Sequence, residues 1–199
     1  MQRLELSSVD GIRLDFAVHH CTVEPTLGVV LLVHGITVDM DEVGGMFVRL
    51  AQQLVLQGFD VVRFSFRGHG ASGGTQQGVT IAGECLDLQA AVTAVRERFA
   101  GQRMSIVAAS FGAVSTALSL SWLDDLYRLV LWNPVLDLRT FLVPELAWGE
   151  EISALPGRNI WPTTIFCSLT VSSSSVVSCS PSSRTTSRWM TSMPQTCRR

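Results

Sequence analysis

Four apolar runs, separated by segments with helical periodicity, most constrain the fold of this chain. They are residues 28–33, 61–66, 104–109 and 127–132. Continuous apolar runs of this length are typical of strands that are buried on both faces of a sheet. The intervening segments place apolar side chains three or four residues apart, which predicts amphipathic helices. Strands that alternate with helices imply right-handed crossovers, so we expect an α/β fold with a mostly parallel sheet and helices on both faces.

The first 20 residues follow a different pattern. Residues 3–7 and 12–19 are short strand-like runs on either side of Val9-Asp10-Gly11, a turn sequence. We expect an antiparallel hairpin at this end of the sheet. Gly58 predicts the end of the first helix, and the glycine-rich stretch 67–74 predicts a turn after the second long strand.

Ser110 lies where the third long run meets a stretch of small residues that can form a helix. Ala108 and Gly112 flank it at the spacing small-x-Ser-x-Gly. A serine on a sharp turn from strand to helix needs small neighbours, since strand and helix approach closely there. Taken alone, the same pattern also fits a serine that caps an ordinary helix. The pattern therefore needs support from the rest of the chain.

That support comes from four motifs in a fixed order. They are His34-Gly35-Ile36, the stretch 67–72 (Arg-Gly-His-Gly-Ala-Ser), the turn at Ser110, and Leu131-Trp132-Asn133-Pro134. Together they resemble the α/β-hydrolases, and within them the serine aminopeptidase and monoacylglycerol-lipase-like branch with its cinnamoyl esterases. The resemblance covers roughly residues 1–165. It implies the α/β-hydrolase fold, incomplete at the C-terminal end.

The resemblance also assigns roles. Ser110 would be the nucleophile, and the backbone amides of Ile36 and Phe111 would stabilise the oxyanion. His34 and Gly35 would shape the loop that carries Ile36, and Ala108 and Gly112 would support the turn. The implied substrate is a small-molecule ester or thioester, with no cofactor and no metal.

A triad of this superfamily ends in a histidine that follows the serine in the chain. The four histidines here are His19, His20, His34 and His69, and none follows Ser110. We expect His34 and His69 to be structural and His19 and His20 to lie at the surface. Asp137 is a candidate acid, but we favour the simpler interpretation that it caps a helix or pairs with Arg139. The sequence thus predicts an impaired catalytic set.

The composition changes after Glu151. All 17 acidic residues lie at or before this position, whereas residues 152–199 contain five arginines and a serine-rich stretch. We therefore divide the chain into a hydrolase core, 1–151, with the start of a cap from about 139, and an aberrant, poorly ordered tail, 152–199. The chain has no lysine, which indicates a GC-rich gene, and codons for 167–171 read out of phase can spell Leu-Ala-His-Gly. A shift of the reading frame near Phe166 is our interpretation of the tail.

Other features limit the classes of function. A net charge of −2 gives no basic surface for nucleic acid, and no apolar run approaches the roughly 18 residues of a membrane span. Without an N-terminal signal sequence, we expect a cytoplasmic protein. Cysteine spacing indicates no metal site, and the sequence leaves the oligomeric state open. Two classes remain: a serine hydrolase of esters, or a related thioesterase or acyltransferase, and a non-catalytic product of a damaged gene.

Overall fold

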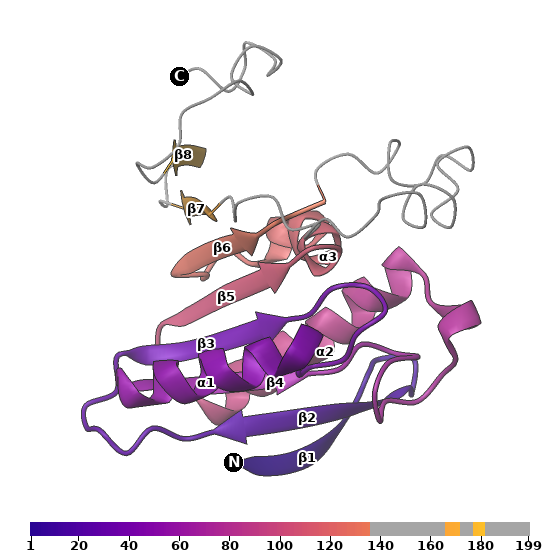
Figure 1. Cartoon of the computed structure of the whole chain (residues 1–199), viewed down its shortest axis with the longest axis horizontal. Coiled ribbons are helices and arrows are strands. Elements are labelled where there is room, and N and C mark those ends of the chain that lie inside the picture. Colours follow the sequence, from indigo (N-terminus) through magenta and orange to yellow (C-terminus); the bar gives the residue numbers. More distant parts are fainter. Residues whose placement is uncertain (136–165, 172–176, 182–199) are drawn as a thin grey trace, which may run out of the picture.

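The computed structural model describes residues 1–135, 166–171 and 177–181. In these residues an eight-stranded sheet has the order β1-β2-β4-β3-β5-β6-β7-β8 (Figure 1). The strands are β1 Gln2–Ser7, β2 Arg13–His19, β3 Gly28–Val33, β4 Phe59–Phe64, β5 Met104–Ala109, β6 Arg128–Trp132, β7 Phe166–Val171 and β8 Val177–Pro181.

The centre of the sheet is parallel and both edges are antiparallel. Strands β4, β3, β5 and β6 run in the same direction, as expected from the alternation of strand and helix in the sequence. β1 and β2 form the predicted hairpin, which pairs with β4. At the other edge, β7 runs antiparallel to β6 and β8 antiparallel to β7. These two strands lie within the segment 152–199.

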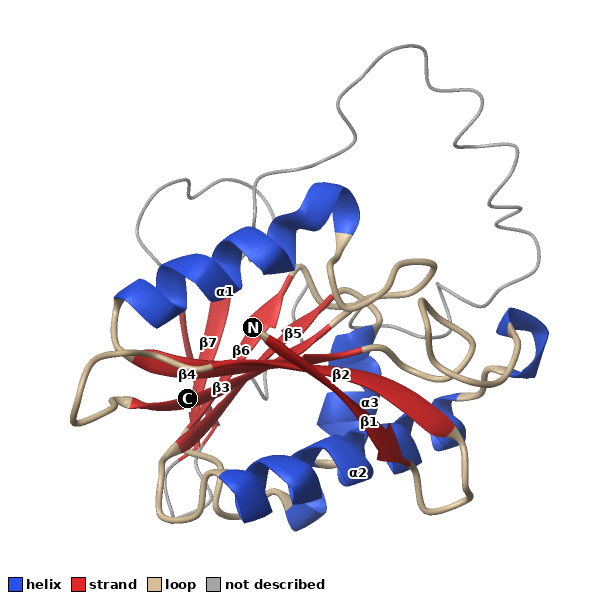
Figure 2. Ribbon diagram, turned by 90° about the horizontal axis from the view of Figure 1, so that it is seen from below, coloured by secondary structure: helices blue, strands red, loops and turns tan. Residues whose placement is uncertain are grey.

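Helices cover both faces of the sheet (Figure 2). α1, Met46–Leu56, lies on one face, and α2, Ile81–Arg98, lies on the other with α3, Gly112–Leu118. Three short 3-10 turns, at Val43–Gly45, Gln76–Gly78 and Leu120–Trp122, complete the described helical segments. The expected α/β architecture is confirmed.

The two faces of the sheet form two apolar clusters. Under α1, the cluster contains Val30, Leu32, Phe47 and Ala51; the larger cluster, under α2 and α3, contains Leu31, Val33, Leu88 and Ile106. Alternate residues of β3 thus enter opposite clusters, and all six of its residues are buried. This is why β3 shows no polar alternation in the sequence.

Register brings the loops that follow the central strands to one edge of the sheet. Val33, the last residue of β3, pairs with Phe64 of β4 and with Ala108 of β5. The sequence predicted the second long strand at 61–66, whereas β4 ends at Phe64. The next two residues leave the ladder with β3, because the Ser65 amide donates to Asp15 O and the Phe66 amide donates to His34 Nε2. Chain segments 34–42, 65–74 and 110–112 therefore meet at the carboxyl ends of the strands, where α/β sheets bind ligands.

Candidate active site

Ser110 occupies a sharp turn between β5 and α3 with a backbone conformation that is rare for a residue with a side chain. Its φ is 47°. Hydrogen bonds to β6 and to the segment after it hold the turn in place. The Ser110 amide donates to Trp132 O (2.9 Å), and the Ser110 carbonyl accepts from Val135 N (3.1 Å). Conformations of this kind cost about 1–3 kcal/mol and persist where surrounding contacts fix them. The turn places the partly exposed Ser110 at the carboxyl edge of the sheet.

Gly112 is the position where the turn tolerates no side chain. A Cβ added there would overlap the carbonyl oxygen of His34 and lie 3.1 Å from Cγ1 of Val33. Ala108, the other small residue of the pattern, is fully buried on β5 between Val33 and Leu131. The pattern small-x-Ser-x-Gly thus reflects how closely the start of α3 approaches the end of β3.

His34 is fully buried and holds the loop that follows β3. Its Nε2 accepts from the amide of Phe66 (2.9 Å), so the proton lies on Nδ1, which donates to Gly35 O (2.7 Å). Burial is the main cause that lowers the pKa of His34 to about 3, with an opposing contribution from the bond to Gly35 O. The neutral imidazole therefore bonds to two backbone groups.

Gly35 lies directly against Ser110. A Cβ at Gly35 would be 3.0 Å from Cβ of Ser110 and 3.5 Å from its Oγ. Within the part of the chain that the structure describes, the amide of the next residue, Ile36, has no hydrogen-bond acceptor. Phe111 is the residue directly after Ser110 and is the N-cap of α3, so its backbone amide lies next to the serine. The structure thus brings the loop of Ile36 and the amide of Phe111 to the same serine.

None of the four histidines hydrogen-bonds to Ser110. His69 is buried against the His34 ring, with 5.3 Å between ring centroids, and its Nδ1 bonds to Arg67 O. His20 lies near Asp60, as expected at the surface, but His19 is half-buried. Desolvation and the charge of Arg63, which donates to His19 Nε2, lower the pKa of His19 to about 4. Asp137, the candidate acid, lies outside the described residues.

Comparison with known protein families identifies the relationship. The model of the serine aminopeptidase family, S33, matches residues 24–198. The chain belongs to this family. The match includes the core from residue 24 onward and nearly all of the segment 152–199.

Solved structures similar to this S33 family member share its fold. An esterase of Pyrococcus furiosus, Pf2001, is 24% identical with a TM-score of 0.54, over 63% of this chain and 49% of its own. Est1E of Butyrivibrio proteoclasticus, solved with ferulic acid, is 21% identical with a TM-score of 0.58, over 63% and 50%. The α/β hydrolase GrgF of Penicillium sp. sh18 is 19% identical with a TM-score of 0.60, over 79% and 55%. The chain thus spans about half the length of these proteins. No curated protein sequence matches it.

The contacts of two charged residues in this family member, Glu42 and Arg67, were not predicted from the sequence. Glu42 Oε1 accepts from the amide of Gly35 (2.6 Å). Arg67 donates to the carboxylates of Asp10 and Asp87, and so joins the hairpin turn, the glycine-rich turn and α2. Arg67 lies in a motif that we singled out, whereas Glu42 carried no recognisable signal, because its contact depends on the path of a loop.

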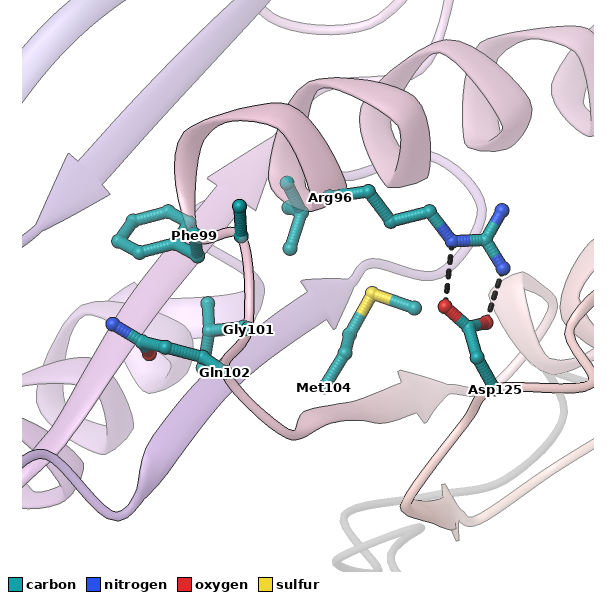
Figure 3. A pocket seen from close by; sticks show the side chains of 9 residues that line it. Arg96, Phe99, Gly101, Gln102, Met104 and Asp125 are labelled. Carbon is teal, nitrogen blue, oxygen red and sulfur yellow. Dashed lines mark hydrogen bonds and ion pairs between the residues drawn. The ribbon is translucent and has the colours of Figure 1, made fainter.

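A pocket of about 320 Å³ lies at the opposite edge of the sheet (Figure 3). Val29 and Met104, at the beginnings of β3 and β5, contribute to its apolar wall, and the ion pair of Arg96 with Asp125 lies beside it. Ser110 follows the end of β5, so this pocket is separate from the serine site. No helix in the described part of the chain is long and apolar enough to cross a membrane.

Proposed function

We propose that the chain is a carboxylic ester hydrolase in which Ser110 forms an acyl-enzyme. The single observation that carries this proposal is the geometry of Ser110: a strained turn at the carboxyl edge of the sheet, with Gly35 against its side chain. A structural serine at the start of a helix has no need of a left-handed backbone. The S33 family match and the esterases among the similar folds support a small-molecule ester as substrate.

In the proposed reaction, Oγ of Ser110 attacks the carbonyl carbon and gives up its proton. The carbonyl oxygen becomes an oxyanion, which the amides of Ile36 and Phe111 stabilise; one such donor is worth about 3 kcal/mol. The carbon–oxygen bond to the alcohol breaks, and the alcohol leaves with the proton that Ser110 gave up. Water then hydrolyses the acyl-enzyme, which releases the carboxylic acid and restores the serine hydroxyl. His34 does not take the proton, since both of its ring nitrogens bond to backbone groups.

The proposal includes an impaired first step, because no histidine bonds to Ser110. A serine hydroxyl with no base is a weak nucleophile. Asp137 stays a candidate for the acid, but an acid orients a histidine and does not replace it. We therefore expect acylation to be slow in this chain.

Reaction with a fluorophosphonate probe tests the proposal without knowledge of the substrate. Labelling that disappears in Ser110→Ala and persists in Ser105→Ala, a matched change on β5, is the expected result. Labelling that is unchanged in Ser110→Ala would contradict a nucleophilic role.

A non-catalytic protein is the second candidate, and the absence of a histidine at Ser110 favours it. Folded protein that gives no labelling would support this candidate. A thioesterase or acyltransferase is a variant of the first proposal. Either enzyme would label at Ser110. With an acyl substrate in place of the probe, a thioesterase would release a thiol from a thioester, and an acyltransferase would pass the acyl group to an added thiol or alcohol faster than to water.

A further inference from the structure

We infer that Glu42 is a positioning residue that fixes the oxyanion loop beside Ser110; this inference rests on the proposed function. Its Oε1 accepts from the amide of Gly35 (2.6 Å) and its Oε2 from the amide of Val43 (3.2 Å). Hydrogen bonds to an ionised carboxylate are shorter and roughly twice as strong as neutral ones. The Gly35 contact, at 2.6 Å, lies at the short limit of such bonds.

Peptide planarity connects this bond to the Ile36 amide. The carbonyl of Gly35 and the amide of Ile36 belong to one rigid peptide unit, in which the two groups point in opposite directions. Nδ1 of His34 holds that carbonyl (2.7 Å), and Glu42 holds the amide of the preceding unit. Two consecutive peptide units are thus fixed by side chains, so the direction of the Ile36 amide is set before a substrate arrives.

The loop that carries Glu42 is itself held in an unusual conformation. Thr37 and Glu42 have φ values of 64° and 58°, which only surrounding contacts maintain. Those contacts come from the end of β4: the Met40 amide donates to Ser65 Oγ (3.1 Å), and Arg63 donates to Met40 O (3.1 Å) and to Asp41. The carboxylate of Glu42 is therefore presented to Gly35 by a rigid support.

Glu42 lies near the serine but acts through Gly35. A Cβ at Gly35 would be 3.3 Å from Glu42 Oε1 and 3.5 Å from Ser110 Oγ. No hydrogen bond joins Glu42 to Ser110 in the described structure, and both carboxylate oxygens are already engaged by amides. The geometry thus favours a role in preorganising the oxyanion site over a role as the missing base.

Two variants and one control test this role in the full chain. Glu42→Ala removes the acceptor, whereas Glu42→Gln keeps an uncharged acceptor of the same shape. Glu97→Gln is the matched control, because Glu97 is exposed on α2 and far along the chain from the loop. We expect the rate constant of fluorophosphonate labelling to fall about ten-fold or more in Glu42→Ala, less in Glu42→Gln, and not at all in the control.

The resonance of the Gly35 amide proton provides a readout that does not require activity. A short bond to a carboxylate shifts this proton resonance downfield. We therefore expect the resonance to move upfield in Glu42→Gln and further upfield in Glu42→Ala. The melting temperature of Glu42→Gln should equal that of the wild type. A Gly35 resonance that does not move, or equal labelling rates in wild type and Glu42→Ala, would overturn the inference. If the wild type does not label, the proposed function fails, and the Gly35 resonance still decides the role of Glu42.

Discussion

At the scale of single residues, two small positions and one histidine explain the shape of the serine site. The sequence predicted that Gly112 and Ala108 support the turn and that His34 is structural, since each belongs to a motif with a steric or packing requirement. The structure gives the partners: the His34 carbonyl above Gly112, and the two backbone bonds of the His34 ring. The role of Glu42 could not be predicted, because it depends on a loop with several positive φ values.

Gly112→Ala tests the close approach of α3 to the end of β3. Alanine favours a helix by about 1 kcal/mol over glycine, but the added Cβ would overlap His34 O. Overpacking of this kind costs about 1–3 kcal/mol, so we expect a net loss of stability in urea denaturation and slower labelling of Ser110. Gly78→Ala is the control, since its Cβ would lie an acceptable 3.4 Å from Thr75 Oγ1. Equal stability of the two variants would contradict the steric argument.

At the scale of elements, periodicity predicted most of the described strands and helices. The helix predicted between the second and third long strands corresponds to α2, whose Thr80 caps the Gly83 amide (3.0 Å). The antiparallel direction of β7 was not predicted, because strand direction depends on connections and not on local composition. The apolar stripe of α2 did not reveal that a carboxyl group, Glu84, lies among its buried residues.

Glu84 makes the stability contributed by α2 depend on pH. The residue is 2% exposed, and its Oε2 has no hydrogen-bond partner among the described residues. Desolvation, and then the charge of Asp87, raise its pKa from 4.5 to about 7, against the opposing charge of Arg67. The folded state therefore retains a proton that the unfolded chain releases. The stability that the protonated, neutral Glu84 side chain contributes is fully present below pH 4.5 and is lost as the pH rises through 7.

Glu84→Gln should remove this dependence, because the amide is neutral at every pH. We expect the variant to gain stability relative to the wild type, and this gain should be up to about 2.5 kcal/mol larger at pH 8 than at pH 5. Urea denaturation at both pH values measures the difference, with Glu97→Gln as the control for an exposed carboxylate. The same gain at pH 5 and pH 8 would show that Glu84 is ionised throughout this range.

At the scale of the whole molecule, the sequence motifs predicted the site in part. The order of the four motifs placed the loop of Gly35 and the turn of Ser110 at one edge of the sheet, because parallel strands bring their carboxyl ends together. The sequence itself has no histidine after Ser110, and the structure places the four histidines that it has without a bond to Ser110. The family match extends to residue 198, so the relationship includes the segment 152–199, whose composition departs from that of the core.

A shifted reading frame after Phe166 would account for both the composition of this segment and the lack of a histidine. We propose that restoring the frame of the gene near codon 167 yields a product with a histidine after Ser110. A histidine that pairs with Ser110 should raise the rate of fluorophosphonate labelling by a factor on the order of 10⁴ over the 199-residue chain. The gain should vanish when Ser110 or the new histidine is replaced by alanine. A gene whose alternative frames encode no histidine there, or a restored product that labels no faster, would contradict the proposal and leave 152–199 as a genuine part of the protein.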